Sequence, residues 1–454
     1  MTIADALPLI MFGTLVVLLF SGFPVAFVLG GVGLLFGLIG MAYGTFSELE
    51  FFNILVRIYG SVVQSYILVA IPMFIFMGTL LERSGIGEDL LHMLQRLLWR
   101  VPGGLAVSVT LLGTIMAATT GIVGASVVML TLLALPILIA RGYSTPMACG
   151  TVASAGTLGI LIPPSIMLVL MADLLLTSVG KLFLAALVPG VLLAMVYVAY
   201  IILTCWMRPS VAPDTQREPP LEDGRTIWGE LLRTFFPPIV LIFLVLGSIG
   251  AGWATTTEAS GVGAFGAMMI ALVKGRLTLP VLRDVLEASG RINAMLFLIF
   301  IGATAFSYVF RALGGDYLVE DVIRSSGADA WTILAGMMAL VFVMGFFFEW
   351  MEITMIVLPI FVPIFPLLDF GAHVDSAYVV IWIAILMSIN LQTSFLTPPF
   401  GITLFYMRGC AIEGVEMTAI YRGVIPFVVL QLLVVAAVAA FPSLAVWLPQ
   451  LILD

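Results

Sequence analysis

Apolar stretches of about 18 or more residues follow one another along almost the whole sequence. Of the 454 residues, 62% are hydrophobic and only 10% are charged, against roughly a quarter in an ordinary soluble domain. Such stretches are long enough to cross a lipid bilayer as helices, which pair their own backbone polar groups. The sequence therefore predicts an all-α polytopic membrane protein and excludes a soluble enzyme.

The charged residues, cysteines and histidines narrow the function further. The net charge of -8 leaves no basic surface for nucleic acid. Cys149, Cys205 and Cys410 lie far apart, so neither a disulfide framework nor a zinc ribbon is expected. His92 and His373 are the only histidines and lie in predicted loops, so a HExxH zinc site is impossible and an intramembrane serine–histidine pair has no candidate. We therefore expect no enzymatic activity.

Glycine, proline and charged clusters divide the apolar sequence into two halves with the same plan. Scaffold helices and an arm are expected in 1–61, and the rest of the first repeat in 62–206. A polar, proline-rich cytoplasmic linker is expected at 207–233. The second half then repeats the plan, with scaffold helices and an arm in 234–291 and the rest of the repeat in 292–454.

Two segments in each half are interrupted near their middle. The overlong stretches 104–140 and 331–368 are broken by Thr119-Thr120-Gly121 and by Glu349-Trp350-Met351-Glu352, which predicts helical hairpins that enter the membrane and return. The segments 145–177 and 378–407 contain Pro163-Pro164 and Pro398-Pro399. Because proline removes a donor and clashes with the preceding turn, each of these two helices must unwind in mid-membrane.

Each half thus has five crossings, one re-entrant hairpin and one proline-broken helix, and the odd count of crossings places the second half upside down. The prediction is therefore two inverted repeats. On this topology all 18 lysines and arginines lie on one side except Arg57, Lys181, Arg311 and Arg324. The positive-inside rule makes that side cytoplasmic. Both termini are expected in the periplasm, and Asp5 with no basic neighbour indicates that the first apolar run is retained.

Broken helices leave unpaired backbone groups inside the membrane, and such groups suit a transporter: carbonyls and hydroxyls bind a hard cation, and N–H groups bind an anion. We expect one sodium site between the first hairpin tip and the break at Pro163, and a second between the Glu349 tip and the break at Pro398. The alternative is that the small residues only permit close helix packing. The predicted metal-site residues are Thr119, Thr120, Gly121, Gly124, Ser126, Gly156, Pro163, Glu349, Glu352, Thr354, Pro398 and Gly401.

Polar residues near the two breaks are candidates for substrate binding, with ordinary helix–helix hydrogen bonding as the alternative. They are Thr157, Ser165, Asn390, Gln392, Thr393, Ser394 and Thr397. Glu349 and Glu352 share a helix face at i, i+3. One of them could help to neutralise a sodium ion, or it could carry a coupling proton. The alternative is that the hairpin tip lies near the outer interface and both carboxylates are simply solvated. Asp173 and Glu258 also lie beside helix breaks, where we expect them to cap exposed backbone.

Several strings carry a family resemblance over essentially the whole chain. They are TGIVGA (120–125), ASAGTLG (153–159), IPPS (162–165), GFFFEWMEI (345–353) and NLQTSFLTPPFG (390–401). The sequence resembles the large membrane subunit (M, DctM-type) of TRAP transporters, the tripartite ATP-independent periplasmic transporters. The resemblance implies an elevator-type, sodium-coupled importer of organic anions, usually carboxylates. It also implies two partners, a small four-helix membrane subunit (Q-type) and a periplasmic substrate-binding protein (P-type).

The sequence departs from the family at the second hairpin tip, where many members have Asp and this chain has Glu349. At this tip it resembles a subgroup of the family, so the substrates of other members cannot be assumed for this chain. The predicted function is sodium-coupled import of an organic anion, a carboxylate, across the bacterial inner membrane as the transport subunit of a tripartite system. The alternative is a stand-alone proton- or sodium-coupled anion carrier of related inverted-repeat fold. A channel is disfavoured, because it needs a continuous pore.

Overall fold

The computed structural model describes residues 3–120, 123–212, 229, 231–399, 401–410, 412 and 414–453. Every regular element in these ranges is helical, and none of them is a strand. Eight helices of the described chain are long and apolar enough to cross a membrane. The prediction of an all-α polytopic membrane protein is confirmed.

The first half opens with two long helices, a shorter one and a bend, and then presents the hairpin and the broken helix. Its elements are α1 (Ile3–Phe20), α2 (Val25–Ala42), α3 (Glu48–Ile58), η1 (Tyr59–Val63), α4 (Ala70–Arg83), α5 (Ile86–Leu97), α6 (Gly104–Thr120), α7 (Val123–Ala140), α8 (Thr145–Thr157), η2 (Leu158–Ile160), α9 (Ile166–Leu174), α10 (Val179–Met207) and η3 (Pro209–Val211).

The second half follows the same order of long helices, surface helix, hairpin and broken helix. Its elements are η5 (Leu231–Phe235), α12 (Phe236–Gly250), α13 (Thr256–Val273), α14 (Leu279–Ala312), α15 (Gly315–Ser326), α16 (Ala330–Met344), α17 (Trp350–Phe361), η6 (Phe365–Leu367), η7 (Gly371–His373), η8 (Ser376–Tyr378), α18 (Val379–Leu396), α19 (Ile402–Gly409), α20 (Met417–Ala440) and α21 (Ser443–Leu453).

The structure corrects two expectations about the segments between these helices. His92 is expected in a loop, but it lies in α5, which has Glu88 and Asp89 in its first turn and Arg96 in its last. Acidic residues at a helix N-terminus and basic ones at its C-terminus favour helix formation. The arm of the first half, expected to end by residue 61, is followed by η1 to Val63, and α4 begins only at Ala70. In the second half the expected arm is continuous with the next helix in the 34-residue α14.

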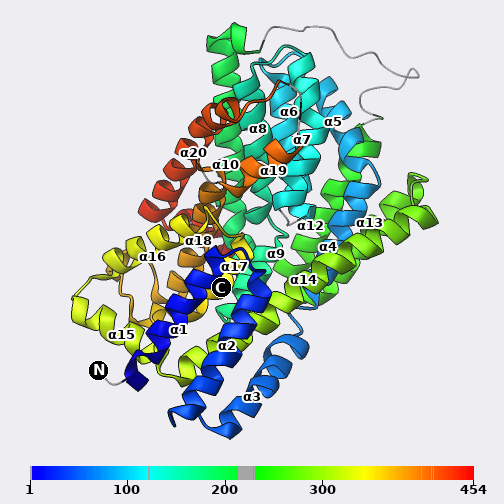
Figure 1. The fold of residues 1–454 in the computed structure, drawn as a ribbon. Helices are drawn as coiled ribbons and strands as arrows, with labels where there is room; N and C mark the ends of the chain where they lie inside the picture. Colours follow the sequence, from blue (N-terminus) through cyan, green and yellow to red (C-terminus); the bar gives the residue numbers. More distant parts are fainter. Residues whose placement is uncertain are drawn as a thin grey trace.

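The helices pack as two groups. In one, α14 packs along α2 and against α3 and α4, and α4 also packs against α13. In the other, α8 lies against α6, α7 and α20, and α18 lies against α16 and α20. Figure 1 shows α1, α2 and α3 at one end of the molecule and α6, α7 and α8 at the other. We call α1–α4 and α12–α14 the scaffold group, and α6–α10 with α16–α20 the hairpin group.

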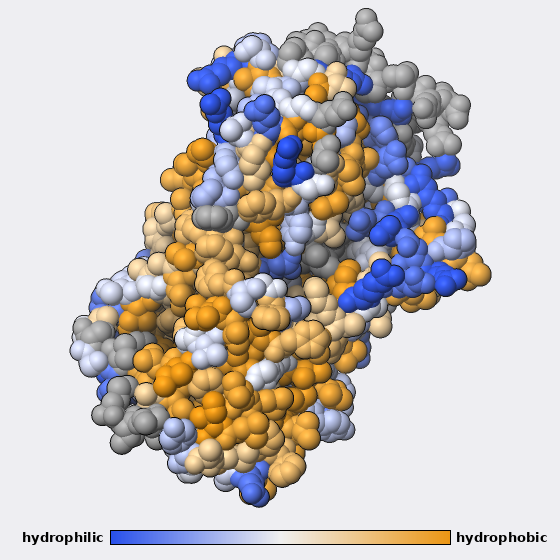
Figure 2. Space-filling view, viewed as in Figure 1, coloured by the Kyte–Doolittle hydropathy of each residue, from blue (hydrophilic) through white to orange (hydrophobic). Residues whose placement is uncertain are grey.

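The two broken helices form the centre of the hairpin group. In α8 every residue from Met147 to Thr157 is buried, and 94% of the apolar window in the span containing α18 is buried. By contrast, Figure 2 shows hydrophobic residues over the outward surfaces of α1, α2, α16 and α20, as a lipid-facing surface requires. Polar side chains on α8 and α18 must therefore find their partners inside the protein.

Candidate functional site

A pair of helices lies at each predicted hairpin, and each predicted broken helix is interrupted near its prolines. Helix α6 ends at Thr120 and α7 begins at Val123, while Gly121 between them lies outside the described residues. The α16–α17 pair turns through 345–349. Between α8 and α9 the chain passes through η2 and Pro163–Pro164, and between α18 and α19 through Pro398–Pro399. Both Pro–Pro peptide bonds are cis. The two broken helices are therefore interrupted where their proline pairs predict.

Each hairpin packs closely against the broken helix of its own half. A Cβ added to Gly156, at the end of α8, would lie 2.5 Å from Cγ2 of Val127 on α7. A Cβ added to Gly345, at the end of α16, would overlap the side chain of Ser394 on α18. Both contacts need glycine, because any side chain there would separate the hairpin from the helix break.

The two halves meet at the breaks. The Gln392 amide of α18 donates from Nε2 to Oγ1 of Thr157 on α8, at 3.3 Å. In addition α17 contacts α9, and α7 contacts α19, so each hairpin reaches the second part of the other half's broken helix. The structure thus brings both tips and both breaks, which are distant in sequence, into one region.

A cavity of about 680 Å³ opens at this region. Its lining comes from the α1–α2 turn, α14, both hairpins and α19, so it lies between the scaffold group and the hairpin group. Among the described residues of this lining, Glu349, Glu352 and Tyr406 have polar side chains, and none is a lysine, arginine or histidine. The full lining is Leu19, Gly22, Phe23, Pro24, Val25, Gly124, Ala125, Val128, Met295, Ile299, Phe347, Phe348, Glu349, Met351, Glu352, Ile402 and Tyr406.

Tyr406 holds the second hairpin tip in place. Its hydroxyl donates to Oε1 of Glu349 at 2.5 Å, across 57 residues of sequence. Its ring also contacts the first hairpin, since a Cβ on Gly124 would lie 3.0 Å from it. Glu352 caps the same tip, where its Oε2 accepts the backbone N–H of Glu349 at 3.1 Å. The sequence reasoning missed Tyr406, whose only signal was a hydroxyl in a short apolar half-helix.

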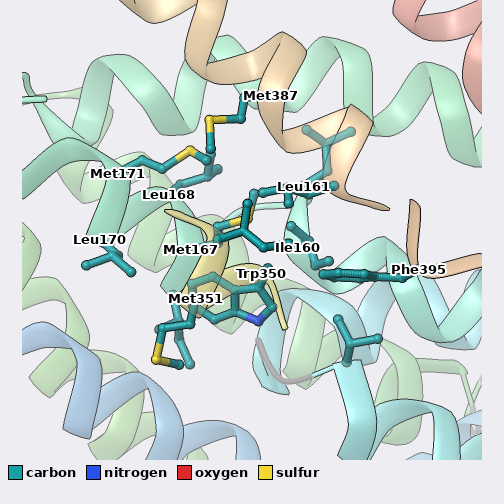
Figure 3. Close-up of a cluster of buried hydrophobic side chains, with 14 of the residues drawn as sticks. Ile160, Leu161, Met167, Leu168, Leu170, Met171, Trp350, Met351, Met387 and Phe395 are labelled. Atoms are coloured by element: carbon teal, nitrogen blue, oxygen red, sulfur yellow. The ribbon is translucent and has the colours of Figure 1, made fainter. Parts of the chain in front are cut away.

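The tip between the two glutamates is anchored in the protein interior. Figure 3 shows Trp350 and Met351 within a buried cluster that includes Ile160 and Met167 from the first broken helix and Phe395 from the second. Trp350 is only 3% exposed. This anchor fixes the backbone of the tip, so both carboxylates are carried on a rigid support.

The predicted substrate residues lie beside the cavity, and none of them lines it. The Asn390 amide donates to the Met338 carbonyl at 2.7 Å, and the Thr397 hydroxyl donates to the Thr393 carbonyl at 2.8 Å. The hydroxyls of Thr157, Ser165, Thr393 and Ser394 donate to carbonyls of nearby residues in their own segments. Ordinary packing hydrogen bonds therefore account for these groups in this conformation, and their role in substrate binding stays a prediction.

The predicted metal-site residues are divided among several positions. Gly124, Glu349 and Glu352 line the cavity. Ser126, Gly156 and Pro163 are buried beside the first break, and the Thr354 hydroxyl donates to the Trp350 carbonyl at 2.6 Å. Pro398 and Gly401 form the second break, whereas Gly121 and the side chains of Thr119 and Thr120 lie outside the described part of the chain.

The two acidic residues expected to cap backbone have clear partners. Oε2 of Glu258 accepts the backbone N–H of Thr255 at 2.8 Å, which closes a capping box at the start of α13. Oδ1 of Asp173 accepts the Ser65 hydroxyl at 3.0 Å. The capping role is confirmed for Glu258, while Asp173 instead joins α9 to the bend before α4.

Comparison with known proteins identifies the family. The family model described as "Tripartite ATP-independent periplasmic transporter, DctM component" matches residues 12–444. The chain belongs to this family. It is therefore the large permease subunit of a TRAP transporter and a multi-pass membrane protein.

Relatives and a solved structure agree with this family. The C4-dicarboxylate TRAP transporter large permease protein DctM of Pseudomonas aeruginosa is 30% identical and covers 85% of this chain and 87% of its own. The sialic acid TRAP transporter large permease protein SiaM of Vibrio cholerae is 26% identical and covers 96% of this chain and 97% of its own. The Alcanivorax borkumensis YdaH transporter shares the fold, with a TM-score of 0.61, 12% identity and 88% of each chain covered.

Proposed function

We propose that this TRAP permease imports an organic carboxylate across the bacterial inner membrane, coupled to sodium, by an elevator mechanism. The two halves are inverted repeats with both termini in the periplasm. The hairpin group moves against the scaffold group and carries the solute. A separate small four-helix subunit and a periplasmic substrate-binding protein complete the system and deliver the solute.

The observation that carries the proposal is the convergence of both hairpin tips and both helix breaks beside a cavity at the boundary between the two helix groups. In membrane transporters, discontinuous helices supply backbone groups for ions and substrates, and alternating access is largely the movement of one repeat or bundle against the other. A cavity placed on that boundary can open to either side as the hairpin group moves.

Buried oxygens near the second break support a sodium site. Oε1 of Gln392 and Oγ1 of Thr403 are buried and have no hydrogen-bond partner among the described residues. A hard cation prefers such oxygen ligands to nitrogen or sulfur. The predicted residues Ser126, Gly156 and Pro163 on one side, and Pro398 and Gly401 on the other, lie at the two breaks that would hold the ions.

The substrate class rests on the relatives, which are named for a C4-dicarboxylate and for sialic acid. A carboxylate also suits the first turn of α7, because unpaired N–H groups at a helix N-terminus favour an anion. Coupling to a proton is the second candidate, and the observation that favours it is the pair Glu349 and Glu352 in the cavity.

Sodium binding tests the proposal without a substrate. The thermal midpoint of the detergent-purified chain is measured in rising sodium chloride, with potassium chloride holding the ionic strength constant. A ligand that binds only the folded state raises the midpoint by mass action. We expect a saturable, sodium-specific rise that Ser126→Ala and Thr397→Ala weaken, whereas Ser443→Ala, outside both breaks, leaves it unchanged. An identical response to both salts contradicts sodium coupling.

A further inference from the structure

The cavity between the two helix groups is acidic. Glu349 and Glu352 contribute carboxylates to its lining, and no cationic side chain of the part of the chain that the structure describes contributes to it. Both side chains are only partly buried, so they face space that a solute can enter. A solute whose only charges are carboxylates would meet like charge here without a matching cation. The lining therefore favours a solute that also carries a positive charge.

Aromatic rings in the same lining point independently to a cation. Phe347 is 43% exposed and Phe23 is 63% exposed, although both line a cavity between packed helices. The face of an aromatic ring attracts an ammonium group, and rings combined with carboxylates are the usual surroundings of ammonium ligands in proteins. Phe347 is held by edge-on contact with Phe20 of α1, with ring centroids 5.0 Å apart. These rings and carboxylates come from both helix groups.

The two glutamates are oriented by groups other than a bound cation. One oxygen of Glu349 accepts the Tyr406 hydroxyl, and one oxygen of Glu352 accepts the Glu349 N–H. Neither partner is charged, so the negative charge of the pair is not neutralised by the side chains described. Gly124 and Ala125, in the first turn of α7, line the same cavity, and a helix N-terminus suits the opposite charge.

We propose that the transported solute is a carboxylate that also bears an ammonium group, and that Glu349 and Glu352 bind this group while the α7 N-terminus receives the carboxylate. This inference rests on the proposed function, because it names the substrate class of the same cavity. It narrows the proposed substrates from organic carboxylates in general to zwitterionic ones. Tyr406 is the positioning residue, since its hydroxyl orients the Glu349 carboxylate. The rings of Phe23 and Phe347 extend the site to methylated ammonium groups.

A four-carbon series tests the charge at one end of the ligand. Succinate, γ-aminobutyrate and butyrate share a four-carbon chain and one carboxylate, and differ in having a second carboxylate, an ammonium or a methyl group. γ-Trimethylammoniobutyrate adds methyl groups to the ammonium. The thermal midpoint of the purified full-length chain is measured against each compound at constant sodium, ionic strength and neutral pH, in the wild type, Glu349→Gln and Glu352→Gln. Glu320→Gln, on the surface helix α15, is the matched control.

We expect the two ammonium compounds to raise the midpoint saturably, and succinate and butyrate to have no effect. Glu349→Gln should weaken the affinity for γ-aminobutyrate, read from the concentration that gives half of the midpoint rise, by about tenfold or more, because it removes one charge of a charge pair. Glu320→Gln should leave this concentration unchanged. Tyr406→Phe, which keeps both carboxylates, should give a smaller loss than Glu349→Gln.

Two results would overturn the inference, and both are read in the wild type even if a variant does not fold. Stabilisation by succinate and not by γ-aminobutyrate would mean that the cavity selects anions. A rise with sodium but with none of the four compounds would assign the carboxylates to the ion, and it would leave the proposed sodium coupling standing. If sodium has no effect on the midpoint but γ-aminobutyrate still raises it, the proposed sodium coupling is contradicted and the inference about the ammonium group stands.

Discussion

Tyr406 links three elements through one side chain. Its hydroxyl bonds Glu349 on the second hairpin tip, its ring contacts Gly124 on the first, and its backbone belongs to α19. A hydrogen bond to a charged group contributes about 1.5 to 3 kcal/mol, and less where water competes. Tyr406→Phe should therefore lower the free energy of unfolding by about 1 kcal/mol, which is seen as a lower thermal midpoint. Tyr317→Phe, on the exposed surface of α15, should not, and equal midpoints for the two variants would show that the bond contributes nothing.

Gly345 tests the close packing between the second hairpin and its broken helix. Gly345→Ala places a Cβ into the Ser394 side chain, so the hairpin must move away from α18. Overpacking of this kind costs about 1 to 3 kcal/mol. Gly336→Ala, within α16 itself and with no atom within 4 Å of the added Cβ, is the matched control. Thermal unfolding should show a loss for Gly345→Ala alone, and an equal change in both would reflect helix propensity instead of packing.

Sequence reasoning at the residue scale found the carboxylates but not their partners. Glu349 and Glu352 were identified because ionisable residues in an apolar stretch are expensive, and the structure places both in the cavity. Tyr406 and the aromatic lining were missed, since a tyrosine or phenylalanine in a membrane helix is ordinary in composition. The polar residues of α18 are predicted to bind substrate because they are polar. Thr397 instead bonds the carbonyl four residues before it, as hydroxyls in helices commonly do. The Asn390 amide bonds the Met338 carbonyl, 52 residues away, a partner that no spacing reveals.

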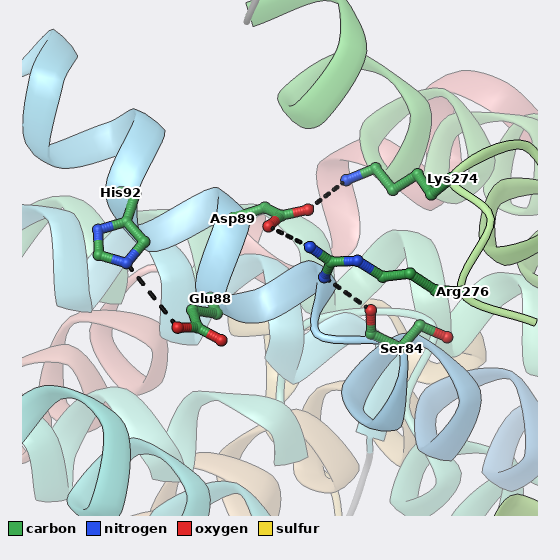
Figure 4. A network of polar contacts seen from close by, with 6 residues as sticks. All are labelled: Ser84, Glu88, Asp89, His92, Lys274 and Arg276. Atoms are coloured by element: carbon green, nitrogen blue, oxygen red, sulfur yellow. Dashed lines mark hydrogen bonds and ion pairs between the residues drawn. The ribbon is translucent and has the colours of Figure 1, made fainter. Parts of the chain in front are cut away.

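At the scale of elements, α5 is the connection between the scaffold group and the first hairpin, and an ion-pair cluster fixes it. Figure 4 shows Asp89 of α5 between Lys274 and Arg276, which lie in the α13–α14 connection. Both cations are 2.9 Å from a carboxylate oxygen, and Arg276 also donates to the Ser84 carbonyl at 2.9 Å. The Lys274 side chain is only 16% exposed. The pairs therefore hold the start of α5 against the scaffold group.

Asp89→Asn should loosen this connection. The substitution removes the negative charge shared by two partly buried cations, and we expect a loss of about 1 kcal/mol, since partly screened ion pairs contribute little more. Glu287→Gln is the control, because its pair with Arg283 lies on an exposed helix face, with side chains 50% and 81% exposed. Thermal unfolding in low salt measures both variants, and the α5 interpretation fails if Glu287→Gln has the larger effect.

The order of elements was predictable because few backbone structures can satisfy their own hydrogen bonds inside a lipid bilayer. A helix pairs its own backbone groups in the membrane, so glycine, proline and charge clusters are the places where an apolar stretch can end or break. Not all of them do, since Pro136, Pro189 and Pro426 lie inside continuous helices. The hairpins and both proline breaks follow from that rule. The helix α5 was missed because its charged residues suggest a loop, although Ile86, Leu90 and Leu94 recur at helical spacing and are buried. The bend before α4 was also missed, since Ser65 and Asp173 form its hydrogen bond across 108 residues of sequence.

At the scale of the whole molecule, the proposed elevator movement requires the two helix groups to separate at the cavity. Phe20 of α1 and Phe347 of the second hairpin tip meet across this boundary, with ring centroids 5.0 Å apart. Trp331 of α16 and His373 of η7 have the same centroid distance, but both lie within segments predicted to move together. These pairs offer matched positions for crosslinking across the boundary and within one side of it.

A cysteine pair at each position separates the elevator from a fixed site. Cys149, Cys205 and Cys410 are first replaced by alanine, and Phe20→Cys with Phe347→Cys, or Trp331→Cys with His373→Cys, is joined by a short thiol-specific crosslinker. Solute uptake is measured in cells that also carry both partner subunits. The bridge across the boundary should abolish uptake reversibly, because it prevents rigid-body movement, and the bridge within the hairpin group should not. Uptake that survives the first bridge would mean that the solute passes through a stationary cavity, and that the two helix groups do not move past one another.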